Sequence, residues 1–208
     1  MSRQHGNLQK YQNSNPLQQA LIQRFLTRVG TLLSGLEIRT ALDAGCAEGF
    51  VSAHLREHEL AEAAFVGVDL DWAALQRGRT FSPFMQRAYS DVLRLPFGDA
   101  QFDLVLSTEV LEHLLDPRLA LREFKRVSRR YVLLSVPHEP WFRGLNFLRG
   151  KHLRRWGNDP EHVNNWSGRQ FADLVAEEME VLATMGAFPW WVVLGQVRNL
   201  DETTERCN

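Results

Sequence analysis

The fold is decided by residues 41–49, which read Ala-Leu-Asp-Ala-Gly-Cys-Ala-Glu-Gly. A short apolar run ends at Leu42, a turn of small residues follows, and an apolar-periodic segment begins at Phe50. A strand, a tight glycine turn and a helix together predict a nucleotide-binding crossover of an α/β sheet. We expect Gly45 to turn the backbone sharply beside a ligand and Gly49 to let the helix start pack closely on the strand.

The carboxylate of Asp43 narrows the choice of ligand. An acid at the strand end would repel a pyrophosphate at the helix N-terminus and would attract an ammonium group. S-adenosylmethionine carries such an ammonium group and no phosphate. Ala47 also stands where a dinucleotide fingerprint has its second glycine. The turn therefore favours S-adenosylmethionine over a dinucleotide.

Composition sets the bounds for the rest of the chain. Its 208 residues with 44% apolar content suffice for one well-packed domain, 1–208, and a net charge of −1 disfavours nucleic acid and anionic membrane as partners. The two cysteines, Cys46 and Cys207, give neither a disulfide framework nor a metal-binding spacing. No signal segment or run of 18 apolar residues is visible, which predicts a reduced, cytoplasmic protein without a transmembrane segment.

The periodicity of the chain predicts alternating helices and strands. We expect an N-terminal covering segment, 1–36, that is loose to residue 15, exposes Tyr11 and becomes helical from Pro16. We expect a loose tail over 200–208. The expected strands cover 41–42, 64–69, 85–88, 102–107, 131–136, 180–187 and 190–197, with helices over 117–127 and 167–178 and a hairpin turn at 188–189.

Five ordered motifs resemble those of class I S-adenosylmethionine-dependent methyltransferases. They lie within residues 38–137 and comprise 42–49, 66–69, 90–92, 102–107 and Glu109-Val-Leu-Glu-His113. The resemblance implies a Rossmann-like, doubly wound sheet of seven mostly parallel strands with an antiparallel last strand. The cofactor would lie across the carboxyl ends of the strands, and S-adenosylhomocysteine would be the product. The departure from the family pattern is Ala47, where a methyl group should be tolerated because no phosphate approaches that backbone.

The resemblance also assigns cofactor contacts along the chain. Asp69 ends a buried strand about 20 residues after the glycine turn, where a carboxylate can accept hydrogen bonds from both ribose hydroxyls. The remaining assignments follow the family motifs: Asp43, Ala44 and Gly45 hold the methionine end, and Gly49 of the same turn is a further cofactor-binding residue. Leu70 helps to hold the ribose, Asp91 and Val92 hold the adenine, and Ser107 and Thr108 lie beneath the methyl group.

Residues 138–166 exceed what the core fold requires, and we interpret them as a lid over the acceptor pocket. Basic residues interleaved with aromatic ones can also indicate a nucleic-acid surface, but the rest of the chain supplies no basic footprint. A solvated surface helix and docking on anionic lipid remain alternatives. The lid would suit an anionic or aromatic acceptor. The aromatic and basic residues of this segment are Trp141, Phe142, Arg143, Phe147, Arg149, Lys151, Arg154, Arg155, Trp156 and Trp166.

Three histidines follow segments expected near the pocket: His113, His138 and His162. A hydroxyl acceptor must lose its proton, and the pKa of a histidine suits that task near neutral pH. We expect one of the three to act as the base.

A metal site is an alternative use of the same region. At i, i+3 and i+4, the side chains of Glu109, Glu112 and His113 would share one helical face. With His162 they would form a set similar to that of metal-assisted 2′-O-methyltransferases of small RNAs, in which a divalent ion lowers the pKa of the acceptor hydroxyl. We do not favour the metal, because many family members carry the same motif without one.

The sequence thus predicts a methyltransferase, a monomer or homodimer, that acts on a small or medium-sized acceptor, with oxygen favoured as the methylated atom. Metal-assisted methyl transfer to a vicinal hydroxyl is one alternative. A catalytically silent cofactor-binding partner protein and, last, an NAD-binding oxidoreductase are the others.

Overall fold

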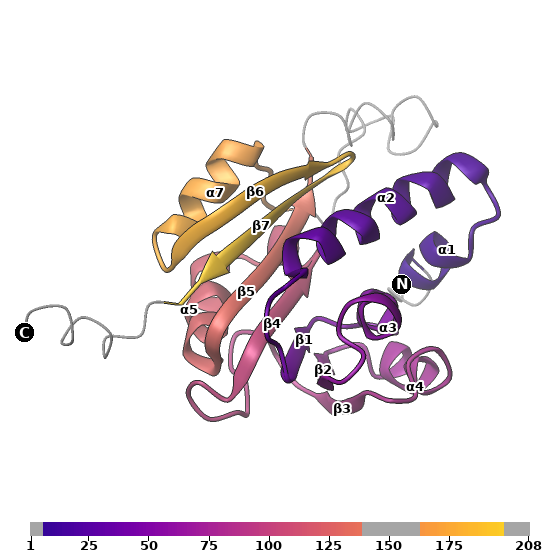
Figure 1. Ribbon diagram of the computed structural model, residues 1–208, viewed down its shortest axis with the longest axis horizontal. Coiled ribbons are helices and arrows are strands. Elements are labelled where there is room, and N and C mark those ends of the chain that lie inside the picture. Colours follow the sequence, from indigo (N-terminus) through magenta and orange to yellow (C-terminus); the bar gives the residue numbers. More distant parts are fainter. Residues whose placement is uncertain (1–5, 139–162, 198–208) are drawn as a thin grey trace, which may run out of the picture.

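The computed structural model describes residues 6–138 and 163–197, and seven strands of this part form one sheet in the order β3-β2-β1-β4-β5-β7-β6. β7 runs antiparallel to both of its neighbours, and the other pairings are parallel. The predicted fold class is confirmed (Figure 1). The strands are β1 (Thr40–Ala44), β2 (Ala64–Asp69), β3 (Gln86–Tyr89), β4 (Phe102–Thr108), β5 (Ser128–Pro137), β6 (Glu180–Ala187) and β7 (Trp190–Gln196).

Helices cover both faces of the sheet (Figure 1). One face carries α1 (Gly6–Gln12), α2 (Pro16–Leu33), α3 (Phe50–His58) and α4 (Trp72–Phe81). The other face carries α5 (Pro117–Val127) and α7 (Gly168–Ala176), and a single 3₁₀ turn, η1 (Leu111–His113), follows β4. No helix within the described ranges is long and apolar enough to cross a membrane.

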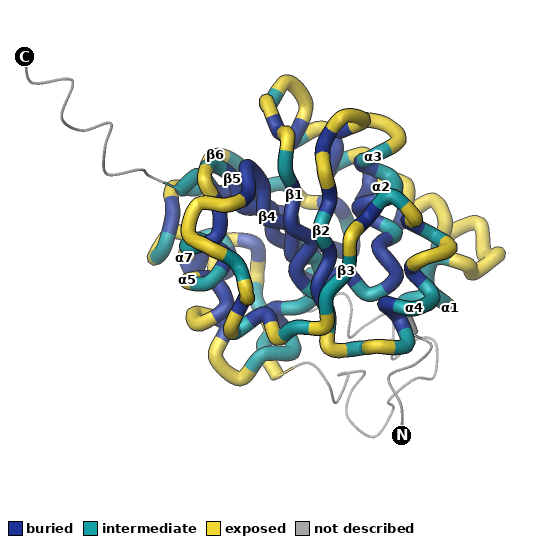
Figure 2. Tube along the Cα trace, turned by 90° about the horizontal axis from the view of Figure 1, so that it is seen from below, coloured by how far each residue is buried: buried dark blue, intermediate teal, exposed yellow. Residues whose placement is uncertain are grey.

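Two apolar layers hold these helices on the sheet, and Figure 2 shows the buried strands at the centre of the molecule. Successive strand residues point to opposite faces, so Leu104 packs in the layer beneath α2 and α3, whereas Val105 packs in the layer beneath α5 and α7. Because parallel strands are buried on both faces, they read in the sequence as continuous apolar runs.

Capping side chains start the helices where the sequence predicts them. Ser167 and Gln170 form a reciprocal capping box at α7, and Asn15 caps α2 immediately before Pro16. The turn at Phe188 and Pro189, whose peptide bond is cis, joins β6 to β7.

The N-terminal segment differs from the prediction. Residues 6–12 form α1 instead of a loose chain, and the Tyr11 ring stacks on Phe50 with ring centroids 4.6 Å apart instead of facing solvent. A helix this short is marginal alone, so contacts from other elements hold it. Those contacts join residues far apart in the chain, which is why local polarity misled the prediction. The tail 200–208 and most of the predicted lid fall outside the described residues.

Candidate active site

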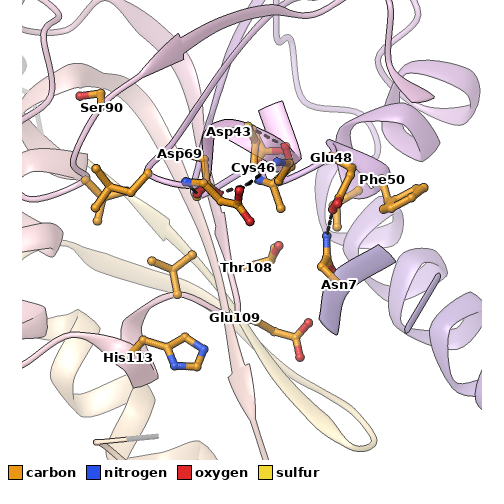
Figure 3. Close-up of a pocket in the computed structure, with 18 of the residues that line it drawn as sticks. Asn7, Asp43, Cys46, Glu48, Phe50, Asp69, Ser90, Thr108, Glu109 and His113 are labelled. Carbon is orange, nitrogen blue, oxygen red and sulfur yellow. Dashed lines mark hydrogen bonds between the residues drawn. The ribbon is translucent and has the colours of Figure 1, made fainter. Parts of the chain in front are cut away.

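A cavity of about 410 Å³ lies at the carboxyl ends of β1, β2 and β4. This is the topological switch point of the sheet: from β1 the chain builds outward through β2 and β3, and then returns to place β4 and β5 on the other side. Open α/β sheets bind their ligands at such a point, because adjacent crossovers diverge there. Figure 3 shows Asp43, Cys46 and Glu48 from the first crossover and Thr108, Glu109 and His113 from the segment that ends and follows β4.

The glycine turn after β1 brings two segments into contact. Gly45 has a left-handed φ of 85°, and a Cβ there would lie 2.3 Å from Cγ2 of Val110. The position therefore admits only glycine without a shift of its neighbours. Gly49 also has a positive φ, but its close neighbour is Ser82, and it is not among the described residues that line the cavity. Gly49 thus serves packing against the end of α4.

Asp43 lines the cavity but is only 2% exposed. Its Oδ2 accepts a hydrogen bond of 2.6 Å from Oγ of Ser52 on α3. The pKa of the Asp43 carboxyl is raised to about 6, mainly by burial and also by the nearby Asp69, while the hydrogen bond from Ser52 opposes the rise. A cation that binds beside Asp43 would lower this pKa and so favour the ionised carboxylate.

Asp69, the last residue of β2, binds the backbone of the glycine turn that follows β1. One carboxylate oxygen accepts from the backbone N–H of Ala47 at 2.8 Å, and the other accepts from the N–H of Asp71 at 2.7 Å. Burial raises the pKa of the Asp69 carboxyl, and these two bonds oppose that rise. Each carboxylate oxygen has a second lone pair, so both can still accept from a ligand. Leu70, nearly half exposed, lines the cavity beside Asp69.

Asp91 and Val92 line the cavity in the connection after β3. Val92 is buried, whereas Asp91 is exposed and accepts a hydrogen bond of 2.9 Å from the N–H of Leu93. This local turn fixes the Asp91 carboxylate at the cavity edge, next to an apolar wall.

The two residues that end β4 have different positions. Thr108 lines the cavity. Ser107 is fully buried, and its hydroxyl donates to the carbonyl of Ala44 at 2.9 Å. Ser107 and Ala44 therefore fasten β4 to β1, and neither is among the described residues of the cavity wall. Both residues were predicted to contact the cofactor, and their hydrogen bond places them between the two strands, beside the cavity wall.

The predicted shared helical face of Glu109, Glu112 and His113 is wrong. Glu109 has a left-handed φ of 58° and precedes the 3₁₀ turn, so only Glu112 and His113 belong to one helical turn. The Glu109 carboxylate ion-pairs with Lys10 and accepts a 2.5 Å bond from Nε1 of Trp190. Among residues 6–138 and 163–197 no group of three or more His, Cys, Asp or Glu side chains could hold a metal.

Glu112 is buried rather than directed into the cavity, with 1% of its surface exposed. Neither carboxyl oxygen has a hydrogen-bond partner among the residues that the structure describes. Burial raises the pKa of the Glu112 carboxyl well above its usual range, with a further contribution from Glu109. Burial thus favours the protonated, uncharged form of Glu112.

The three predicted bases do not share one environment. His113 lines the cavity (Figure 3). His138 instead stacks on the ring of Trp191, with centroids 4.9 Å apart, and is not among the described residues of the cavity. His162 lies outside the described residues.

Sequence reasoning missed one group of cavity residues, on α1 and around Glu48. Glu48 is 1% exposed and accepts a hydrogen bond of 2.9 Å from Asn7 (Figure 3). It also accepts bonds of 2.6 and 2.9 Å from Arg77. It thereby joins α1, the glycine turn and α4. An acid inside a turn of small residues was the available signal, but its two partners lie 41 and 29 positions away.

The strand order and the acid-lined cavity at the switch point define the class: a Rossmann-like α/β protein that binds a nucleoside-containing cofactor. Residues 42–135 match the family model described as a methyltransferase domain. A probable S-adenosylmethionine-dependent methyltransferase of Mycolicibacterium smegmatis is 29% identical over 155 residues, which cover 72% of this chain and 55% of that protein. The O-methyltransferase cnsE of Penicillium expansum is 33% identical over 112 residues, 51% of this chain and 40% of that protein.

A solved structure shares the fold. Magnesium protoporphyrin IX methyltransferase from Synechocystis, determined with bound S-adenosylhomocysteine, superposes with a TM-score of 0.67 at 17% identity and covers 92% of each chain. The family model and the curated relatives support membership of the class I S-adenosylmethionine-dependent methyltransferase family. It spans about half the length of the curated relatives that it matches.

Proposed function

We propose that this protein transfers the methyl group of S-adenosylmethionine to a hydroxyl oxygen of a small or medium-sized molecule, with His113 as the general base. The proposal depends on one observation: acids suited to the cofactor and a candidate base line the same cavity. Asp43 and Asp69 line it at the ends of β1 and β2, and Thr108 and His113 line it at and after the end of β4. The relative named an O-methyltransferase supports oxygen as the methylated atom.

The residues present fit the cofactor. The Asp43 carboxylate suits the ammonium of the methionine end, and Asp69 keeps free lone pairs for ribose hydroxyls. The missing side chain of Gly45 leaves room between the turn and Val110 that a Cβ would fill. Asp91 and Val92 offer a carboxylate and an apolar wall for the adenine.

The chain has two tasks in the reaction. When bound, the cofactor supplies a methyl group that its sulfonium already activates. The cavity aligns the acceptor hydroxyl and excludes water, which lowers the entropic part of the barrier. The imidazole of His113 takes the proton of that hydroxyl, and Thr108 shapes the wall beside it.

A panel of phenols, catechols and carboxylic acids, screened for a product heavier by one methylene, tests the proposal. We expect His113→Ala to lose at least 100-fold in turnover and to keep the wild-type affinity for S-adenosylhomocysteine. His138→Ala, outside the described cavity, is the matched control and should keep turnover. A wild type that binds S-adenosylhomocysteine but methylates nothing would favour the catalytically silent partner protein, and loss of turnover with EDTA would favour the metal-assisted alternative.

A further inference from the structure

The side chains of Tyr11, Glu109 and Trp190 surround the ammonium group of Lys10, and we call these four residues the ammonium cage. The Lys10 ammonium ion-pairs with the Glu109 carboxylate and lies 4.5 Å from the centroid of the Trp190 ring and 5.3 Å from that of Tyr11. The indole Nε1 of Trp190 donates to the other Glu109 oxygen at 2.5 Å. One carboxylate and two aromatic faces are the groups that recognise organic cations.

The cage is assembled from three distant parts of the chain and is largely buried. Lys10 and Tyr11 come from α1, Glu109 follows β4, and Trp190 begins β7. The side chains of Lys10 and Glu109 are 20% and 24% exposed, and Trp190 is 4% exposed. Solvent therefore screens this ion pair less than it screens an ordinary surface pair.

The cage opens into the cavity on the side assigned to the acceptor. Tyr11 and Glu109 line the cavity together with Thr108 and His113. Neither Lys10 nor Trp190 is among the described lining residues, so the cavity meets the cage at Tyr11 and Glu109. A ligand in the cavity can therefore reach the Glu109 carboxylate.

The element that carries Lys10 is short. α1 has seven residues, and a helix of this length gains little stability from its own hydrogen bonds. Side chains hold it instead: Asn7 bonds to Glu48, Tyr11 stacks on Phe50, Lys10 pairs with Glu109, and Nε2 of Gln18 donates to the Lys10 carbonyl at 2.9 Å. A cation that replaces the Lys10 ammonium breaks the ion pair and leaves the other contacts in place.

We propose that the ammonium cage recognises an alkylammonium group of the acceptor, and that Lys10 occupies it in this structure as a substitute for that group. The inference rests on the proposed function and narrows its substrate class to cations that carry a hydroxyl. Charge in the cavity supports it, because Asp43, Asp69 and Glu109 all present carboxyl groups to a ligand.

Competition for the cage tests the proposal on the wild-type protein. Choline, which has a hydroxyl and a cationic group, is the probe, and its uncharged isostere 3,3-dimethylbutan-1-ol is the control. Acetic anhydride labelling followed by mass spectrometry should show at least a threefold rise in Lys10 modification with choline and none with the isostere. Lys125, whose side chain is 43% exposed, serves as the internal reference. Unchanged Lys10 labelling would overturn the proposal.

Calorimetry on variants gives a second readout. Lys10→Ala empties the cage and should bind choline at least tenfold more tightly than the wild type, whereas Lys10→Arg keeps it filled and should not. Adding Glu109→Gln to Lys10→Ala should remove the gain. Equal affinity of Lys10→Ala for choline and its isostere would contradict the cage.

Titration of the same variants with S-adenosylhomocysteine separates the two proposals. If the cofactor product binds but choline does not act at Lys10, only the ammonium cage is refuted. If S-adenosylhomocysteine binds none of the proteins, the proposed function itself fails, whatever choline does.

Discussion

The backbone N–H of Ala47 donates to the carboxylate of Asp69 at 2.8 Å, so the end of β2 fixes the glycine turn after β1. Ala47 has a left-handed φ of 46°, a conformation that costs a non-glycine residue about 1–2 kcal/mol. A charge-assisted bond from Asp69 offsets part of that cost. Asp69, which we assign to the ribose of the cofactor, therefore also stabilises the glycine turn, which we assign to the methionine end.

Replacement of Asp69 tests this double role. Asp69→Asn loses the negative charge and one acceptor, so we expect binding of S-adenosylhomocysteine to weaken by about 1–3 kcal/mol. Isothermal titration calorimetry measures the change. Asp173→Asn, at an exposed carboxylate on α7, is the matched control and should bind like the wild type. Equal affinities of the two variants would remove Asp69 from the ribose site.

The pKa of Asp43 predicts a specific pH dependence of stability. Burial raises it to about 6, so the folded state holds this proton more tightly than the unfolded state does, and stability falls as the pH rises from about 4 to 6. Asp43→Asn removes this penalty. Its free energy of unfolding, relative to wild type, should increase by about 2 kcal/mol between pH 4.5 and 7.5. Urea denaturation at both pH values measures it, and parallel pH profiles would contradict the buried carboxyl.

The same titration affects ligand binding. A cofactor ammonium needs the ionised form of Asp43, so the affinity for S-adenosylhomocysteine should decrease by up to about tenfold per pH unit below pH 6. Asp43→Asn should bind weakly throughout and lose this dependence. Calorimetric titrations between pH 5 and 8 provide the comparison.

A comparison of Gly45, in the glycine turn, with Gly35 distinguishes the cost of backbone strain from the cost of a steric clash. Gly45 and Gly35 have similar positive φ values, 85° and 79°, but a Cβ at Gly35 meets nothing within 4 Å. Gly35→Ala should cost about 1–2 kcal/mol from strain alone. Gly45→Ala should cost at least about 1 kcal/mol more, because its Cβ collides with Val110. Chemical denaturation measures the free energy of unfolding of both variants. Val110→Ala added to Gly45→Ala should remove the extra cost of the clash but not the cost of the backbone strain.

The buried acid Glu112 should weaken the fold at neutral pH. Its raised pKa means that stability is lost as the pH rises above the usual carboxyl range. Glu112→Met keeps the size of the side chain and removes two oxygens without hydrogen-bond partners, so we expect a gain of about 1–3 kcal/mol at pH 7.5 and a smaller one at pH 4.5. A loss of stability at both pH values, measured by urea denaturation, would indicate that the carboxyl has a favourable role.

Local sequence was enough to predict the sheet and to place Asp43 and Asp69 near one another. The apolar runs of β1, β2, β4 and β5 are buried on both faces, so no competing pattern obscures them. Asp43 and Asp69 end such runs, and strand ends of a parallel sheet meet at one edge. Their positions in the cavity therefore followed from the chain order.

Side-chain direction and distant contacts could not be predicted in this way. Ser107 precedes Thr108 by one position, yet only Thr108 lines the cavity, since neighbouring strand residues face opposite sides. The motif that begins at Glu109 has helical spacing, but its left-handed backbone at the first position separates Glu109 from Glu112. The sequence does not encode that change of direction in any local periodicity.

The sequence by itself determined the α/β class, the mostly parallel sheet with its antiparallel last strand and a ligand cavity at the carboxyl edge of β1 and β2, because periodicity and turn chemistry are local properties. Only the tertiary structure decided that α1 covers the cavity, that His138 packs on Trp191 and that Lys10 meets Glu109 and Trp190. The physical reason is that these contacts join residues tens to hundreds of positions apart, and packing rather than local propensity selects them.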